Sequence, residues 1–209
     1  MRSPAPAEFS IRTITAGLTL ESLDNLAPVE EATGFLATAR TAFESAGFVV
    51  QSTRLCTQPL AALLASQGPT QTLAGLCRLD HLVADRQLLI SIGALHSSDM
   101  ENGDFPPWAA DLVAATRETY FSIAVPDQES RVCEPSTRVA ARTIRAISQV
   151  GANGEANFRF AAAARVPSST PFFPVAYHSG PPAFSIGLES AGLGGEAFLD
   201  AQDFAAATL

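Results

Sequence analysis

Apolar residues along the chain follow two alternating patterns. Short runs rich in branched residues, such as LLISIGAL at 88–95, are typical of buried strands, whereas apolar residues spaced three or four apart are typical of amphipathic helices. We expect strands at 9–20, 48–55, 88–95, 122–125, 153–160 and 184–189, and helices at 28–46, 59–67, 70–87, 108–119, 136–150 and 196–209. This order predicts an α/β fold with about six mostly parallel strands alternating with helices.

The length of the chain fits one domain. Residues 1–8 are rich in proline and alanine and read as a disordered tail, and we expect residues 9–209 to form a single α/β domain.

Several predicted strands carry small or polar residues on one face. These positions are spaced by two in each strand: Thr13, Thr15, Gly17 and Thr19; Ser91 and Gly93; Ser185, Gly187 and Glu189. A closed eight-stranded barrel fills its centre with branched apolar side chains, which these faces lack. We therefore expect either a wider barrel that admits a loop or ligand, or an open sheet with a cleft.

The predicted strand at 153–160 has the most polar face. Asn153, Glu155, Asn157 and Arg159 alternate with Phe158 and Phe160. Two interpretations stay open: a pair of Glu155 with Arg159 on an exposed sheet face, or a polar lumen. A lumen predicts that these groups converge with Thr13, Ser91 and Glu189.

The charged residues narrow the function classes. The net charge is −8 and all 13 basic residues are arginine, so there is no lysine for a Schiff base or a Walker-type phosphate site. The acidic balance argues against a nucleic-acid partner. A small-molecule anion fits, because arginine binds carboxylate or phosphate through two parallel hydrogen bonds.

The three cysteines, an odd number with no CxxC pair, indicate a reducing compartment. The first residues lack the apolar core of a signal peptide, and no apolar run is long enough to span a bilayer. We therefore expect a cytoplasmic protein with no membrane partner.

Three arginines fall in predicted strands. Arg12, Arg54 and Arg159 either form an anion clamp at the carboxyl ends of the strands or make structural ion pairs with Glu155 or Glu189.

Four further residues carry candidate chemistry. His178, after Tyr177 in a proline-fixed segment, is a candidate general base or a structural histidine, and Cys56, close behind Arg54, is a candidate thiolate or an inert buried thiol. His96 and Asp99 begin an acidic loop that either ligates a divalent cation or is simply solvated, and calcium-loop spacing is not met.

Three segments together resemble a known family. IRTITAGLTL (11–20), GANGEANFRFAAA (151–163) and TPFFPVAYH (170–178) are similar to the N-terminal part of the PFL-like family, the domain of unknown function 711 group. The resemblance implies about half of a wide α/β barrel related to pyruvate formate-lyase and the other glycyl radical enzymes. It implies no particular reaction. The chain has neither an Arg-Val-x-Gly-Tyr motif nor adjacent cysteines, so we expect chemistry without a glycyl radical.

Two functions are therefore expected as alternatives. The first is an enzyme that acts on a small carboxylate-bearing metabolite, with His178, Glu155 and Cys56 as catalytic candidates. The substrate-binding candidates are Arg12, Arg54, Arg159, Asn153, Asn157, Tyr177 and Glu189. The second is a ligand-binding or regulatory barrel without chemistry. No cofactor is indicated. An unfinished barrel exposes a sheet edge, so we also expect a homo-oligomer, a second chain that completes the barrel, or a longer protein of which this is a fragment.

Overall fold

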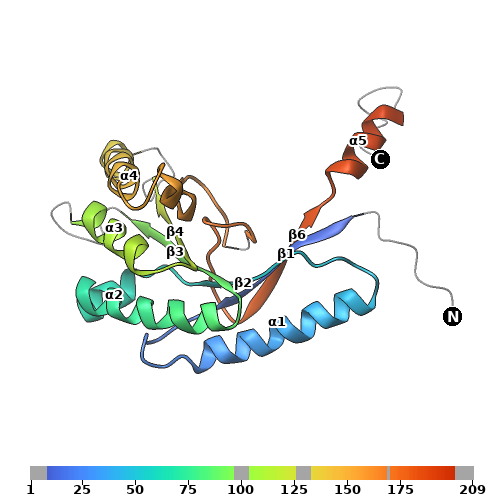
Figure 1. The fold of residues 1–209 in the computed structure, drawn as a ribbon, viewed down its shortest axis with the longest axis horizontal. Helices are drawn as coiled ribbons and strands as arrows, with labels where there is room; N and C mark the ends of the chain where they lie inside the picture. The colour runs from blue at the N-terminus through green and yellow to red at the C-terminus, as the bar shows by residue number, and fades with distance from the viewer. Residues whose placement is uncertain (1–8, 97–103, 126–132, 169, 201–209) are drawn as a thin grey trace.

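The computed structural model describes residues 9–96, 104–125, 133–168 and 170–200. Its elements are β1 (Ser10–Leu18), α1 (Ala27–Ser45), β2 (Thr53–Thr57), α2 (Ala61–Asp85), β3 (Leu89–His96), α3 (Phe105–Ala115), β4 (Thr119–Ala124), α4 (Glu134–Ile147), the 3-10 helix η1 (Glu155–Arg159), β5 (Phe160–Ala163), β6 (Ala183–Glu189) and α5 (Ala191–Asp200). The alternation of strands and helices confirms the predicted α/β fold (Figure 1).

The strands form one open sheet in the order β5-β4-β3-β2-β1-β6. Strands β1 to β5 are parallel and follow the order of the chain, whereas β6 pairs with β1 antiparallel. The sheet is not a closed barrel, which is consistent with a partial barrel. Because crossovers between parallel strands are right-handed and always step in the same direction here, they place α1 to α4 on one face.

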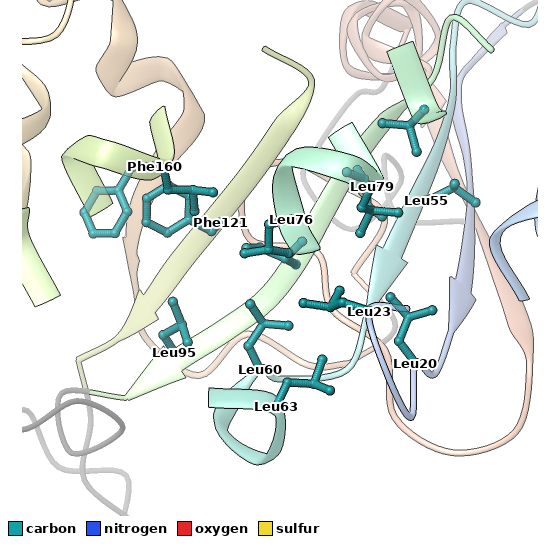
Figure 2. Close-up of a cluster of buried hydrophobic side chains, with 14 of the residues drawn as sticks. Leu20, Leu23, Leu55, Leu60, Leu63, Leu76, Leu79, Leu95, Phe121 and Phe160 are labelled. Atoms are coloured by element: carbon teal, nitrogen blue, oxygen red, sulfur yellow. The ribbon is translucent and has the colours of Figure 1, made fainter. Parts of the chain in front are cut away.

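The face beneath these helices is the hydrophobic core. Inward-facing strand residues such as Leu55, Ile90 and Phe121 have no solvent exposure. Figure 2 shows Leu76 and Leu79 of α2 in the same cluster as Leu55 and Phe121. Burial of each leucine stabilises the fold by roughly 1.5–3 kcal/mol, so this face is the main source of stability.

The opposite face is the small and polar one that the sequence predicts. Thr13, Thr15, Ser91 and Ser122 lie there, each no more than 1% exposed. They are covered by residues 164–168 and 170–182, which we call the strap. Hydroxyl groups attach it: Thr15 Oγ1 donates to Pro171 O at 2.8 Å, and Ser91 Oγ donates to Ala176 O at 2.7 Å. Of the two expected arrangements, the structure has the open sheet, and the strap lies over its small and polar face.

The predicted strand at 153–160 is wrong. Residues 155–159 form η1, and β5 begins only at Phe160. The cause is the preceding turn, in which Gly151, Asn153 and Gly154 all have positive φ angles, at 79°, 57° and 68°. These left-handed conformations end an extended chain, so the polar residues line no strand face.

Other boundaries shift by a few residues. The predicted helices at 59–67 and 70–87 join as α2, with a break at Gly68, whose φ is 75°, before Pro69. The second strand is β2 at 53–57 rather than 48–55, and α4 spans 134–147 rather than 136–150. The last helix is α5 at 191–200, and residues 201–209 lie outside the described part.

Candidate functional site

A cavity of about 240 Å³ lies at the carboxyl ends of β3, β4 and β5, between the sheet and the strap. Its polar lining consists of His96, Ser122, Arg165 and Tyr177, and small or apolar side chains complete the wall. Open α/β sheets bind ligands at this edge, because the loops that follow parallel strands meet there. The position makes this cavity the candidate site.

A β-bulge in β3 shapes the cavity wall. The pairing of β3 with β4 shifts between Ser91 and Ala94, and Gly93 within the shift has a φ of 68°. A Cβ atom at Gly93 would lie 2.6 Å from Gln58 O, so only glycine fits. Beyond the bulge, Ala94 pairs with Ser122 and His96 with Ala124, and all four residues line the cavity.

Ser122 carries the strongest sign of a ligand. Its side chain is 1% exposed, and its Oγ has no hydrogen-bond partner within the described residues. A buried hydroxyl without a partner costs about 1–3 kcal/mol. A ligand atom in the cavity that bonds to Ser122 Oγ would remove that cost.

Arg165 lines the cavity, and its backbone has a strained conformation. It lies two residues after β5 and has a φ of 54°, in the left-handed region that residues other than glycine rarely adopt. Such strain costs on the order of 1–3 kcal/mol and clusters at functional sites. The guanidinium group supplies five donors in a planar fork suited to a carboxylate.

Of the seven predicted substrate-binding residues, all of which the structure describes, Tyr177 alone lines the cavity. Its hydroxyl donates to Val166 O at 3.1 Å, which ties the two arms of the strap together beside the cavity. His96, predicted as a metal ligand, reaches the same cavity from the end of β3.

His178 lies outside the lining of this cavity. It is 4% exposed, its backbone N–H donates to Thr57 O at 2.9 Å, and its ring Nε2 lies 2.9 Å from Gly180 O. Because a carbonyl oxygen only accepts, this bond requires the proton on Nε2. The ring also lies so close to Gly17 that a Cβ there would be 2.2 Å from Nδ1. These contacts hold the strap to the sheet.

Of the other two catalytic candidates, Cys56 pairs with Gly17 on the strap-covered face near His178, whereas Glu155 lies apart from both. Cys56 is buried, and burial raises the pKa of its thiol from 9.0 to about 12, so it stays protonated at neutral pH. Glu155 is exposed on η1, which precedes β5 and therefore lies at the amino edge of the sheet.

Arg12 and Arg54 lie near the amino ends of β1 and β2, not at the expected carboxyl ends. Burial, and then the charge of Arg12, lower the pKa of Arg54, whose guanidinium lies 5.0 Å from the Phe173 ring centre. Arg12 donates to Gln51 Oε1 at 2.9 Å, and the Gln51 amide donates to Glu189. Glutamine thus links Arg12 to Glu189.

Arg159 donates to backbone carbonyl groups. Its guanidinium donates to Thr116 O at 2.8 Å and to Val113 O, so it caps the last turn of α3. Burial is the main cause that lowers its pKa. Asn153 is exposed and Asn157 is half-buried beside η1, and neither lies in the strap-covered face with Thr13 and Ser91.

The predicted metal pair is only partly described. Asp99 lies outside the described residues, and within them no three His, Cys, Asp or Glu side chains are grouped to hold a metal ion.

Ser122 and Arg165 are the cavity residues that the sequence patterns miss. In the segment FSIAV (121–125), Ser122 alternates with the apolar residues on either side, as the residues of the small face do in the other strands. This alternation could have been used to find it. Arg165 is the first charged residue after FAAAA, and a strand placed at 160–163 would have put it at the carboxyl edge.

Comparisons with known proteins agree with the resemblance at the level of the family. A family model described as "Uncharacterised ACR (DUF711)" matches residues 5–207. No curated protein matches the chain. The relationship to pyruvate formate-lyase stays a prediction. Among the described residues, no helix is both long enough and apolar enough to cross a membrane.

Proposed function

Since this chain belongs to the DUF711 family, whose description names no reaction, we propose a function from the cavity itself. The cavity binds a small carboxylate-bearing metabolite, with Arg165 holding the carboxylate and Ser122 bonding to a second polar atom of the ligand. The unpartnered, buried Ser122 hydroxyl carries this proposal.

The size of the cavity supports a small ligand. Its volume of about 240 Å³ gives room for a metabolite of several heavy atoms. The walls other than the four polar residues are small or apolar, which favours a ligand with a short carbon skeleton.

We propose His96 as the proton-transferring group of this site. An imidazole both donates and accepts protons, and His96 shares the cavity with Arg165 and Ser122. A carboxylate held by Arg165 would place the adjacent carbon or hydroxyl over the paired strands β3 and β4, on the face that carries His96 and Ser122.

A non-catalytic binding protein is the second candidate, and one observation favours it. Of the predicted acid–base groups, His178 is bonded to the backbone, the Cys56 thiol has a pKa of about 12, and Glu155 is exposed on η1. His96 would therefore have to transfer protons without a second acid–base group from this set. A site with a single such group is better suited to binding a ligand than to catalysing proton transfer.

Binding of mono- and dicarboxylates with two to five carbons, measured by calorimetry, tests the proposal. We expect Arg165→Gln to weaken binding of the best ligand roughly tenfold or more, and Ser122→Ala to weaken it by a smaller factor. Arg142→Gln, on the exposed face of α4, is the matched control and should leave affinity unchanged. If no carboxylate binds, or if both arginine variants behave alike, the anion site is wrong.

The two candidates separate at His96. With a ligand identified, His96→Asn should abolish its turnover and leave its affinity within a few-fold if the site is catalytic. Absence of any chemical change in the ligand on prolonged incubation with the wild-type chain would instead support the binding protein.

A further inference from the structure

Within the part of the chain that the structure describes, the strand β6 forms an unpaired edge of the sheet that is apolar on one side. It is the last strand in the order of the sheet, so one row of its backbone groups has no strand partner. Phe184 is 51% exposed and Leu188 is 50% exposed, on the face that the helices cover elsewhere. Long apolar edges pair with other chains unless they are blocked.

The helix α5 continues from this edge and projects away from the molecule (Figure 1). It shares no extensive contact with another described element, and Leu199 is 87% exposed. Gly192, Gly194 and Gly195 lie in its ten residues, and each glycine disfavours a helix by roughly 1 kcal/mol relative to alanine. A short, glycine-rich helix is not stable in water without a packing partner.

A second cavity, of about 440 Å³, lies at the opposite end of β6. It opens between the end of β1, the first turns of α1 and the start of β6, and its lining includes Leu18, Phe35 and Phe184. The rings of Phe35 and Phe184 lie 5.1 Å apart at its wall. The chain's own α5 starts a whole strand length away, roughly 20 Å for seven residues, and points outwards.

We propose that a second copy of this chain pairs with β6 and places its α5 over this cavity, in a reciprocal exchange. The antiparallel pair is centred on Ile186, with the two-fold axis through it. Phe184 then faces Leu188 of the second copy, and Ser185 faces Gly187 of the second copy. Apolar side chains meet apolar ones on one face and small side chains meet on the other, so the strand is complementary to itself.

This register also brings the helix to the cavity. With Ile186 at the centre, Ser190 of the second copy lies opposite Pro182, and Pro182 lines the cavity. The helix α5 of the second copy therefore begins beside the opening, and its apolar residues reach Phe35. The test is therefore whether α5 of one copy reaches the cavity of the other copy.

Sedimentation equilibrium of the full 209-residue chain is the first measurement. We expect the wild type to sediment as two copies, and Leu199→Asp to weaken the dimer at least tenfold, because a charge replaces an apolar anchor. Phe158→Asp is the matched control, since Phe158 is 82% exposed on η1 at the far side of the sheet, and it should leave the dimer intact. A wild-type chain that stays folded and monomeric, or equal effects of the two variants, would overturn the proposal.

Cross-linking in trans keeps the test independent of folding defects. Phe35→Cys and Leu199→Cys are made in separate chains, in a background with Cys77 and Cys133 replaced by serine, and then mixed under mild oxidation. The proposal expects a disulfide-linked heterodimer between the two chains. Neither chain alone should give it. A stable dimer in which this cross-link does not form would show that another surface holds the copies together.

Discussion

At the residue scale, buried charge in this protein holds backbone in place. Asp80 of α2 is 2% exposed and accepts hydrogen bonds from Arg117 N at 2.9 Å, Glu118 N at 2.8 Å and Thr119 Oγ1 at 2.7 Å. One carboxylate thus binds the three residues that lead into β4. Arg159 does the same for the end of α3 from the other side.

Replacing Asp80 by alanine should lower the free energy of unfolding by about 2–4 kcal/mol, because two backbone N–H groups and one hydroxyl lose a charged acceptor. Urea denaturation followed by circular dichroism measures the change. Asp85→Ala, on the exposed side of the same helix, should change it by less than about 0.5 kcal/mol. Equal losses in the two variants would contradict this role.

The thiol of Cys56 should make the fold sensitive to alkali. Burial raises its pKa from 9.0 to about 12, so the folded state favours the protonated thiol. Its contribution to stability is therefore complete below pH 9 and is lost as the pH rises from about 9 towards 12, by up to about 1.4 kcal/mol per pH unit. Chemical denaturation at a series of pH values measures this loss.

Cys56→Ala serves as the control for that pH series. The variant starts less stable because it leaves a small cavity, but its stability should fall less steeply above pH 9 than that of the wild type. Parallel curves would mean that the thiol ionises as readily in the folded chain as in the unfolded one.

At the element scale, the strap depends on close contact with β1. Gly17→Ala would place a Cβ 2.2 Å from His178 Nδ1 and 2.7 Å from His178 Cγ, so the ring must move. We expect a loss of about 1–3 kcal/mol in unfolding free energy and faster hydrogen exchange in residues 176–180.

Gly34→Ala is the matched control on α1, where a Cβ meets nothing within 4 Å. It should leave stability unchanged or raise it by up to about 1 kcal/mol, because alanine favours a helix. Adding His178→Ala to Gly17→Ala should restore part of the loss. If it restores none, the clash with the ring is not the cause.

The order of elements is predictable from the sequence because β3 and β4 are short segments rich in branched and aromatic apolar residues, whereas α4 has charged residues at helical spacing. Asn153, Glu155, Asn157 and Arg159 are spaced by two, as residues on one face of a strand are. The spacing alone does not show whether the backbone φ angles are those of a strand, and here they are not. The glycines at 151 and 154 were the available sign of a turn.

The candidate site is less predictable than the fold. Tyr177 and His96 can be singled out because polar residues next to strand ends or prolines stand out in a sequence. Ser122 becomes notable only when burial and the absence of a partner within the described residues are known. Arg12 already stood near the start of the predicted strand, whereas Arg54 moves from the carboxyl end of the predicted strand at 48–55 to the amino end of β2 at 53–57.

At the scale of the whole molecule, an exchange of α5 would make stability depend on concentration. A dimer is favoured by mass action, so the melting temperature should rise with protein concentration. Differential scanning fluorimetry over a roughly hundredfold range of protein concentration measures this shift in melting temperature. The Leu199→Asp variant should lose most of the concentration dependence. A melting temperature independent of concentration in both chains would argue for a folded monomer.

The two faces of the sheet also differ in what they would expose to water. Leucine, isoleucine and phenylalanine side chains lie under the helices, whereas Thr13, Thr15 and Ser91 lie under the strap. Heat capacity rises when apolar surface is hydrated and falls when polar surface is hydrated. Release of the strap alone would therefore change the heat capacity less, per unit of exposed area, than opening of the helix-covered face, and its urea dependence would be small because it exposes only a small part of the total surface. Native-state hydrogen exchange would reveal it as a local opening with a very small denaturant dependence, well below the energy of global unfolding.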